Sequence, residues 1–137
     1  MTPSAMSPRD RAAFDDALAK VRGDHATLRS LAVAAFRDSH YGADATMSLA
    51  AAMMSHENAE VQLFDLPFVS RPPDSVISTA KRARLRCEEY TSGTYRLPDA
   101  HAAAGLFVDA LLLHLAVEDA WLAKEDEHQR ERLRTIA

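Results

Sequence analysis

The sequence predicts an all-α protein folded as an up-down-up-down four-helix bundle. Apolar residues recur along several stretches at alternating spacings of four and three residues, which is the period of a helix that buries one face. Alanine and leucine are abundant, only four glycines are present, and no stretch alternates apolar and polar residues with the period of two typical of strands. The helical stretches are joined by short connections, so neighbouring helices are expected to run antiparallel.

The length of 137 residues suits one hydrophobic core, and we expect a single domain over residues 1–137. Its core is predicted at about residues 8–123, followed by a charged tail over residues 124–137. Hydrophobic residues make up 47% of the chain and charged residues 26%, which is typical of folded globular proteins.

Charge and polarity argue against several classes of partner. The formal net charge of -4 is unfavourable for a nucleic-acid-binding surface. The first ten residues are polar, so no signal peptide is expected, and the apolar run over residues 100–117 is interrupted by ionisable side chains, which predicts that it does not span a membrane. Since a single cysteine, Cys87, also fits a reducing compartment, we expect a cytoplasmic protein.

The first predicted helix begins at residues 7–10, where Ser-Pro-Arg-Asp forms a capping box. Its apolar residues follow the four-and-three spacing, and His25 fills the place in this series between Val21 and Leu28. The helix is expected to end near Gly42, a residue suited to a helix C-terminus. His25 is therefore predicted to face the core.

The second predicted helix covers residues 43–64 and repeats the pattern. His56 lies in its apolar series, and Glu60 follows one helical turn later. Residues 65–73 contain three prolines, which remove backbone donors and restrict the residues before them, so this segment is predicted to be a linker.

The third predicted helix covers residues 75–91, with Asp74 as its cap. Cys87 lies on its apolar stripe and is expected to be a small core residue. This helix contains no histidine, and residues 92–97 are expected to form a loop after it.

The fourth predicted helix begins at residues 98–99 and runs through Trp121 into the charged tail. His114 and Glu118 lie four residues apart in its most apolar part, so their side chains stack on one helix face. Because a buried unpaired carboxylate costs several kcal/mol or changes its protonation state, Glu118 is expected to have a partner.

Five potential ligands are predicted to meet on the axis of the bundle. Imidazole and carboxylate groups are ligands for iron, zinc or manganese, and carboxylates from different helices can bridge a pair of metal ions. A lone core histidine is more often hydrogen-bonded than a ligand, and an isolated His/Glu pair is usually a surface contact. Two such pairs joined by a third core histidine favour a metal site. The candidate ligands are His25, His56, Glu60, His114 and Glu118.

Three segments resemble the ligand motifs of one known family: residues 24–29 with His25, residues 56–60, and residues 114–122. They are similar to the helix-1 histidine and the two His-x-x-x-Glu motifs of the hemerythrin-like, or HHE cation-binding, domains. The resemblance covers nearly the whole chain. It implies a hemerythrin-like bundle, a carboxylate-bridged di-iron centre, and a carrier or sensor of dioxygen or a small oxidant, as a monomer or homodimer. No separate nucleophile is visible, so an enzyme is less expected.

The third helix departs from the family pattern. Matched on residues 82–86, the family's helix-3 histidine corresponds to Arg82, which cannot bind a metal cation. By resemblance, His25 and His56 with the two glutamates would complete one metal position, whereas the other keeps only His114 and the same glutamates. One metal ion, an asymmetric pair, or a metal-free bundle in which Arg82 pairs with a glutamate are all open. In the last case the protein would be an interaction or regulatory module.

Overall fold

The computed structural model describes residues 7–37, 43–93 and 99–134, apart from the side chains of residues 132–134. These residues form four α-helices and no strand, which confirms the all-α prediction. The predicted helix end at Gly42 and most of the predicted loop at 92–97 lie outside the described residues. The helices are α1 (Pro8–Arg37), α2 (Ala43–Phe64), α3 (Asp74–Ser92) and α4 (Asp99–Arg134).

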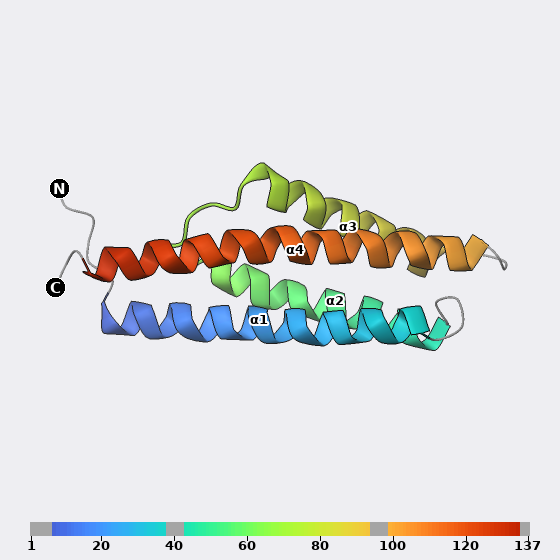
Figure 1. Ribbon diagram of the computed structural model, residues 1–137, viewed down its shortest axis with the longest axis horizontal. Coiled ribbons are helices and arrows are strands. Elements are labelled where there is room, and N and C mark those ends of the chain that lie inside the picture. The colour runs from blue at the N-terminus through green and yellow to red at the C-terminus, as the bar shows by residue number, and fades with distance from the viewer. Residues whose placement is uncertain (1–6, 38–42, 94–98, 135–137) are drawn as a thin grey trace.

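Successive helices run in opposite directions, as the colour gradient in Figure 1 shows. α1 packs mainly against α2, and α3 packs mainly against α4. Fewer contacts join α1 to α4 and α2 to α3, so two antiparallel pairs meet along these two seams.

The ends of α1 and α3 are formed differently. At α1, Ser7 Oγ accepts a hydrogen bond from the Asp10 backbone N–H at 3.1 Å, and Asp10 Oδ2 accepts one from the Ser7 N–H at 3.3 Å. This is the predicted capping box. α3 differs from expectation, because Asp74 is its first residue and the capping position is Pro73, whose side chain makes no capping hydrogen bond.

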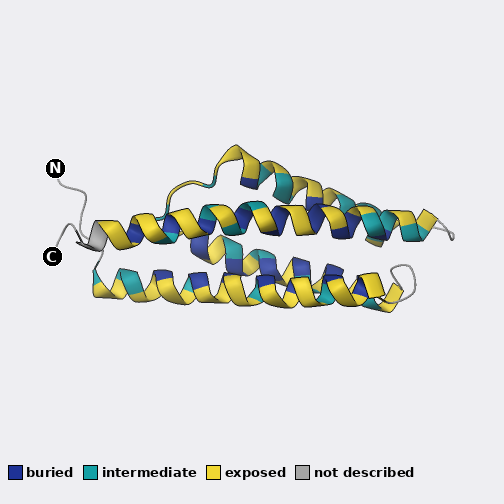
Figure 2. Cartoon of the chain, viewed as in Figure 1, coloured by how far each residue is buried: buried dark blue, intermediate teal, exposed yellow. Residues whose placement is uncertain are grey.

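The core consists of two apolar clusters with a polar layer between them. Figure 2 shows that buried residues face the interior along each helix, while the outer faces are exposed. One cluster includes Leu28, Met53 and Leu115, and the other includes Val21, Ala59 and Leu122. On α1, α2 and α4 the residues between these apolar positions are histidines and a glutamate, so ionisable side chains are enclosed by apolar side chains at both ends.

Two residues of the predicted tail belong to the folded core. Glu125 and Gln129 are 5% and 1% exposed. Gln129 Nε2 donates to the Phe68 carbonyl at 2.8 Å, and the Ser70 backbone N–H donates to Glu125 Oε1 at 2.9 Å. These bonds fix the linker between α2 and α3 to α4, and they extend the core beyond the predicted limit at residue 123.

By length and composition alone, the stretch Asp99–Glu131 of α4 is apolar enough to cross a membrane. It is thus less polar than its ionisable residues led us to expect. Core helices of soluble proteins meet the same criterion, and 39% of its most apolar part is buried within the bundle. The cytoplasmic location stays a prediction.

Candidate metal centre

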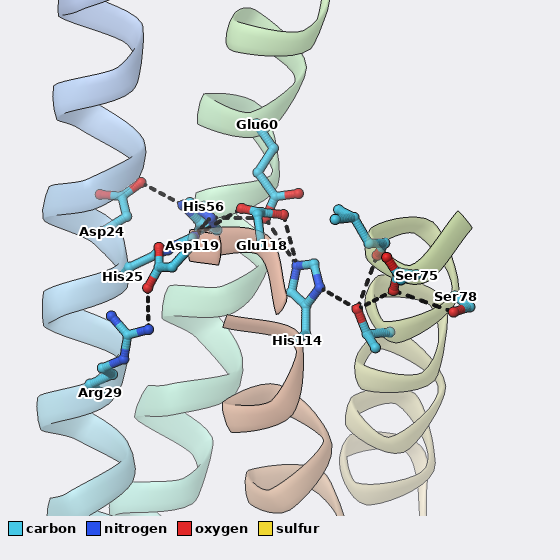
Figure 3. A network of polar contacts seen from close by, with 12 residues as sticks. Asp24, His25, Arg29, His56, Glu60, Ser75, Ser78, His114, Glu118 and Asp119 are labelled. Carbon is cyan, nitrogen blue, oxygen red and sulfur yellow. Dashed lines mark hydrogen bonds and ion pairs between the residues drawn. The ribbon is translucent and has the colours of Figure 1, made fainter. Parts of the chain in front are cut away.

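The polar layer brings the five predicted ligands together from three helices (Figure 3). His25 comes from α1, His56 and Glu60 from α2, and His114 and Glu118 from α4. The three histidines are at most 4% exposed and Glu118 is fully buried. Only Glu60 is partly exposed, so the layer is closed to water except on its side.

Four of these residues form a tight group. Nε2 of His25 lies 2.9 Å from Glu118 Oε1 and 3.2 Å from Nε2 of His56. Nε2 of His56 lies 2.8 Å from Glu60 Oε1. One ligand atom from each of the four residues lies within 4.8 Å of the others, a spacing at which they could hold a metal ion.

His114 lies beside this group and reaches it through the two glutamates. Its Nε2 is 3.0 Å from Glu118 Oε2 and 3.7 Å from Glu60 Oε1. Glu118 therefore faces His25 with one oxygen and His114 with the other. The two carboxylates lie between two candidate metal positions. The first position has two histidines, His25 and His56, and the second has one, His114.

Each histidine also has an outer partner at Nδ1. Asp119 Oδ1 lies 2.6 Å from Nδ1 of His25, and Asp24 Oδ2 lies 2.9 Å from Nδ1 of His56. A carboxylate accepts the Nδ1 proton, which leaves Nε2 directed into the layer and able to bind a metal ion once it has no proton. Carboxylate–histidine pairs of this kind orient histidine ligands in metal sites.

Thr79 of α3 has the same role for the third histidine. Its Oγ1 donates to the Ser75 carbonyl at 2.9 Å and lies 3.0 Å from Nδ1 of His114. Because the hydroxyl proton is used on the carbonyl, Thr79 accepts the Nδ1 proton of His114. All three rings thus direct Nε2 inward, where a bound metal ion would replace any proton on that nitrogen.

The spacing of the apolar residues did not predict these outer partners. Asp24 directly precedes His25, and Asp119 directly follows Glu118. One residue corresponds to about 100° of rotation around a helix, so each aspartate faces a neighbouring helix and not the axis. The feature of the sequence that could have predicted these partners is an acidic residue next to a candidate ligand.

Basic side chains keep the outer aspartates ionised. Burial acts to raise the pKa of Asp119, but hydrogen bonds from Arg29 and His25 outweigh it and lower this pKa. Burial likewise opposes the lowering of the pKa of Asp24, which hydrogen bonds with His56 and Lys20 bring about. Both aspartates therefore act as anionic acceptors.

Without a metal, the inner groups neutralise one another. Burial opposes ionisation of Glu60, but hydrogen bonds with His114 and His56 lower its pKa to about 2. Burial also disfavours the charged form of His114, yet its contacts with Glu118 and Glu60 raise its pKa to about 9. The pKa of His56 is raised too, because bonds to Glu60 and Asp24 outweigh its desolvation.

One buried oxygen of the candidate centre is not fully satisfied. Glu118 Oε2 is close to His114 Nε2 but receives no hydrogen bond of normal geometry from the described residues. A buried carboxylate oxygen without a donor is costly, and a cation shared between the Nε2 atoms and the carboxylates would satisfy it. The donor set therefore fits a metal ion.

α3 brings no histidine or carboxylate to the centre within the described residues, in line with the missing helix-3 ligand. Arg82 is exposed and makes no ion pair among those residues, so the expected pairing of Arg82 with a buried glutamate is absent. Two other α3 residues, Ala80 and Ala83, line a cavity of about 40 Å³ beside His114. Of the two neighbours Arg82 and Ala83, it is Ala83 that is buried.

Cys87 does not replace the missing ligand. It lies in the apolar cluster that also contains Leu28, Met53 and Leu115, and burial raises the pKa of its thiol. A buried protonated thiol is a poor ligand and a poor nucleophile.

Comparison with known proteins adds no assignment. No protein-family model matches the chain, and neither a curated protein nor a solved structure matches it. The interpretation of the centre therefore depends on the geometry of the chain itself.

Proposed function

We propose that the protein is a hemerythrin-like, non-haem iron-binding protein that carries or senses dioxygen or a related small oxidant. One observation carries the proposal: three imidazoles are held at Nδ1 by outer acceptors, and each Nε2 lies within 3.0 Å of a carboxylate oxygen of Glu60 or Glu118. The resemblance to hemerythrin-like domains supports iron, whereas the ligand types alone suit zinc or manganese equally. Bound iron would supply oxygen binding and a change of redox state.

The ligand geometry supports two unequal metal positions. Four residues hold the first: His25, His56, Glu60 and Glu118. The second has one histidine and a share of the two carboxylates, because α3 contributes no ligand. We expect the first position to fill before the second, and a carboxylate-bridged pair to form only at higher metal concentration.

The rest of the chain prepares the centre for this chemistry. The outer acceptors hold the rings in the ligating tautomer, and the two apolar clusters exclude water from both ends of the layer.

Metal analysis of the full chain, purified without a chelating tag and reconstituted with iron(II), tests the proposal. We expect His56→Ala and Glu118→Ala to lose the metal, and His128→Ala, a change of an exposed histidine on α4, to keep it. Less than about 0.1 equivalent of metal, unchanged by the first two substitutions, would contradict the proposal.

Optical spectra of the ferrous protein test the oxidant. We expect a change in visible absorption on exposure to dioxygen that is reversed on its removal and is absent in Glu118→Ala. Metal binding without any response to dioxygen, peroxide or nitric oxide would indicate that the iron is stored or has a structural role. This result would contradict a carrier or sensor.

One observation favours a second candidate, a metal-free interaction or regulatory module. The inner histidines and glutamates lie within ion-pair distance of one another, so their charges have partners even without a metal. Thermal melts separate the candidates, because a ligand that binds only the folded state raises its stability. An unchanged melting temperature with added iron or zinc would favour the module.

A further inference from the structure

A pocket of about 270 Å³ lies between α2 and α3, next to the candidate centre. Its walls are largely apolar, with Val61 and Phe64 from α2 and Val76 and Ile77 from α3. Glu60 of the centre forms part of the same lining. The volume is close to the lower end of the roughly 300–1,000 Å³ of small-molecule sites. It therefore suits a compact organic ligand.

The charges around the pocket are matched with one exception. Arg84 Nε donates to Glu57 Oε1 at 3.0 Å, so these two charges neutralise each other. Glu60 faces the histidines of the centre, the nearest being His56. Lys81 is exposed and makes no ion pair or side-chain hydrogen bond among the described residues. An unmatched positive charge therefore lies at the edge of an apolar pocket.

We propose that this pocket binds a small apolar carboxylate, an organic acid of about the size of phenylpropionate. The carboxylate pairs with Lys81, and the apolar part lies against Phe64 and Ile77. Burial of apolar area supplies the affinity, and the charge selects an anion over a neutral molecule. This site goes beyond the proposed iron centre, because none of its binding contacts needs a metal.

The chain contains a built-in reporter for this site. Phe64 packs edge to face against Trp121, with ring centroids 5.6 Å apart, and Trp121 is the single tryptophan. A ligand that contacts Phe64 therefore changes the surroundings of the tryptophan, and intrinsic fluorescence measures its binding.

The test is a fluorescence titration of the full chain with three compounds. 3-Phenylpropionate has both the apolar body and the charge, 3-phenylpropanol has the same body without the charge, and propionate has the charge without the body. We expect saturable binding of phenylpropionate, binding of phenylpropanol weaker by about two- to fivefold, as for one exposed ion pair, and no measurable binding of propionate.

Matched variants assign the response to the pocket. Lys81→Gln should reduce phenylpropionate affinity to that of phenylpropanol, whereas Lys124→Gln, at an exposed lysine outside the pocket, should not. Val61→Asp should weaken both phenyl compounds by roughly tenfold, because it places a charge in the apolar wall, and Val33→Asp, at an exposed α1 valine, should not.

An absent response to phenylpropionate, equal affinity for acid and alcohol, or equal losses in variant and control would overturn the proposal. Lys81→Gln leaves every candidate metal ligand in place, so its iron content should equal that of the wild type. Failure of the carboxylate site is therefore distinguishable from failure of the iron centre.

Discussion

Replacing Asp119 with asparagine tests whether the outer acceptors prepare the histidines for metal. Asp119 Oδ1 lies 2.6 Å from His25 Nδ1, and its other oxygen pairs with Arg29. Asparagine keeps the shape but removes the charge, so the Nδ1 proton of His25 loses its anionic acceptor. A hydrogen bond to a charged group contributes about 1.5–3 kcal/mol, and loss of such an outer partner lowers metal affinity by about 10–100-fold.

Competition with a chromophoric chelator measures this loss directly, with zinc as a redox-silent metal and iron(II) as the proposed one. The Arg29 side chain is 44% exposed, so its pair with Asp119 is screened. Arg29→Gln should therefore cost less than about 1 kcal/mol, or roughly fivefold in affinity.

Asp126→Asn serves as a matched control. Asp126 also lies on α4 and pairs with arginine, 3.1 Å from Arg130 Nε, but it touches no histidine. We expect its metal affinity to equal that of the wild type. An affinity of Asp119→Asn within twofold of the wild type, or an equal loss in Asp126→Asn, would refute the role of the outer acceptors.

Two further predictions concern the second metal position and the metal-free protein. Ala83→His should raise the bound metal from one ion toward two, because Ala83 lines the cavity beside His114. Arg82→His, at an exposed position, should not raise it. Equal metal content in both variants would contradict this placement of the second metal position. In the metal-free protein, the pKa of His114 is raised from 6.5 to about 9. Its protonated form therefore contributes up to about 3 kcal/mol to the free energy of unfolding. This contribution is complete below pH 6.5 and is lost as the pH rises through 9. The pKa of Glu60 is lowered from 4.5 to about 2, so its contribution is present above pH 4.5 and is lost as the pH falls through 2. Melting temperatures of the metal-free protein should therefore be highest between about pH 4.5 and 6.5, and a profile that stays flat from pH 6.5 to 9 would count against the ion pairs.

The periodicity of the sequence was sufficient to predict the four helices and the convergence of the five candidate ligands. On α1, α2 and α4 the histidines occupy positions in an apolar series, and such positions face the axis in any antiparallel arrangement of the helices. The convergence of His25, His56 and His114 follows from local spacing together with short connections.

The outer partners required the structure because they depend on how the helices rotate against one another. Asp24 is one residue away from the buried series, and spacing alone does not tell whether it faces solvent or α2. The inward-facing position of α3 could not be predicted for the same reason. With no histidine to fix its register, its sequence did not distinguish Arg82 from Ala83 as the inward position, and packing against α4 decides it.

The end of the core also depends on long-range contacts. Glu125 and Gln129 resemble a solvated tail in a charged sequence, yet they are buried because the linker between α2 and α3 supplies a backbone donor and a backbone acceptor. The pocket between α2 and α3 also depends on long-range contacts, because it forms where these two helices are only loosely packed.

Anomalous diffraction at the iron edge, from crystals of the full chain loaded with iron(II), tests the central proposal most directly. The expected result is a peak between Nε2 of His25 and His56 and the carboxylates of Glu60 and Glu118, with any second, weaker peak beside His114. An iron-loaded crystal with no anomalous peak in this layer, or with its main peak elsewhere on the molecule, would contradict the iron centre.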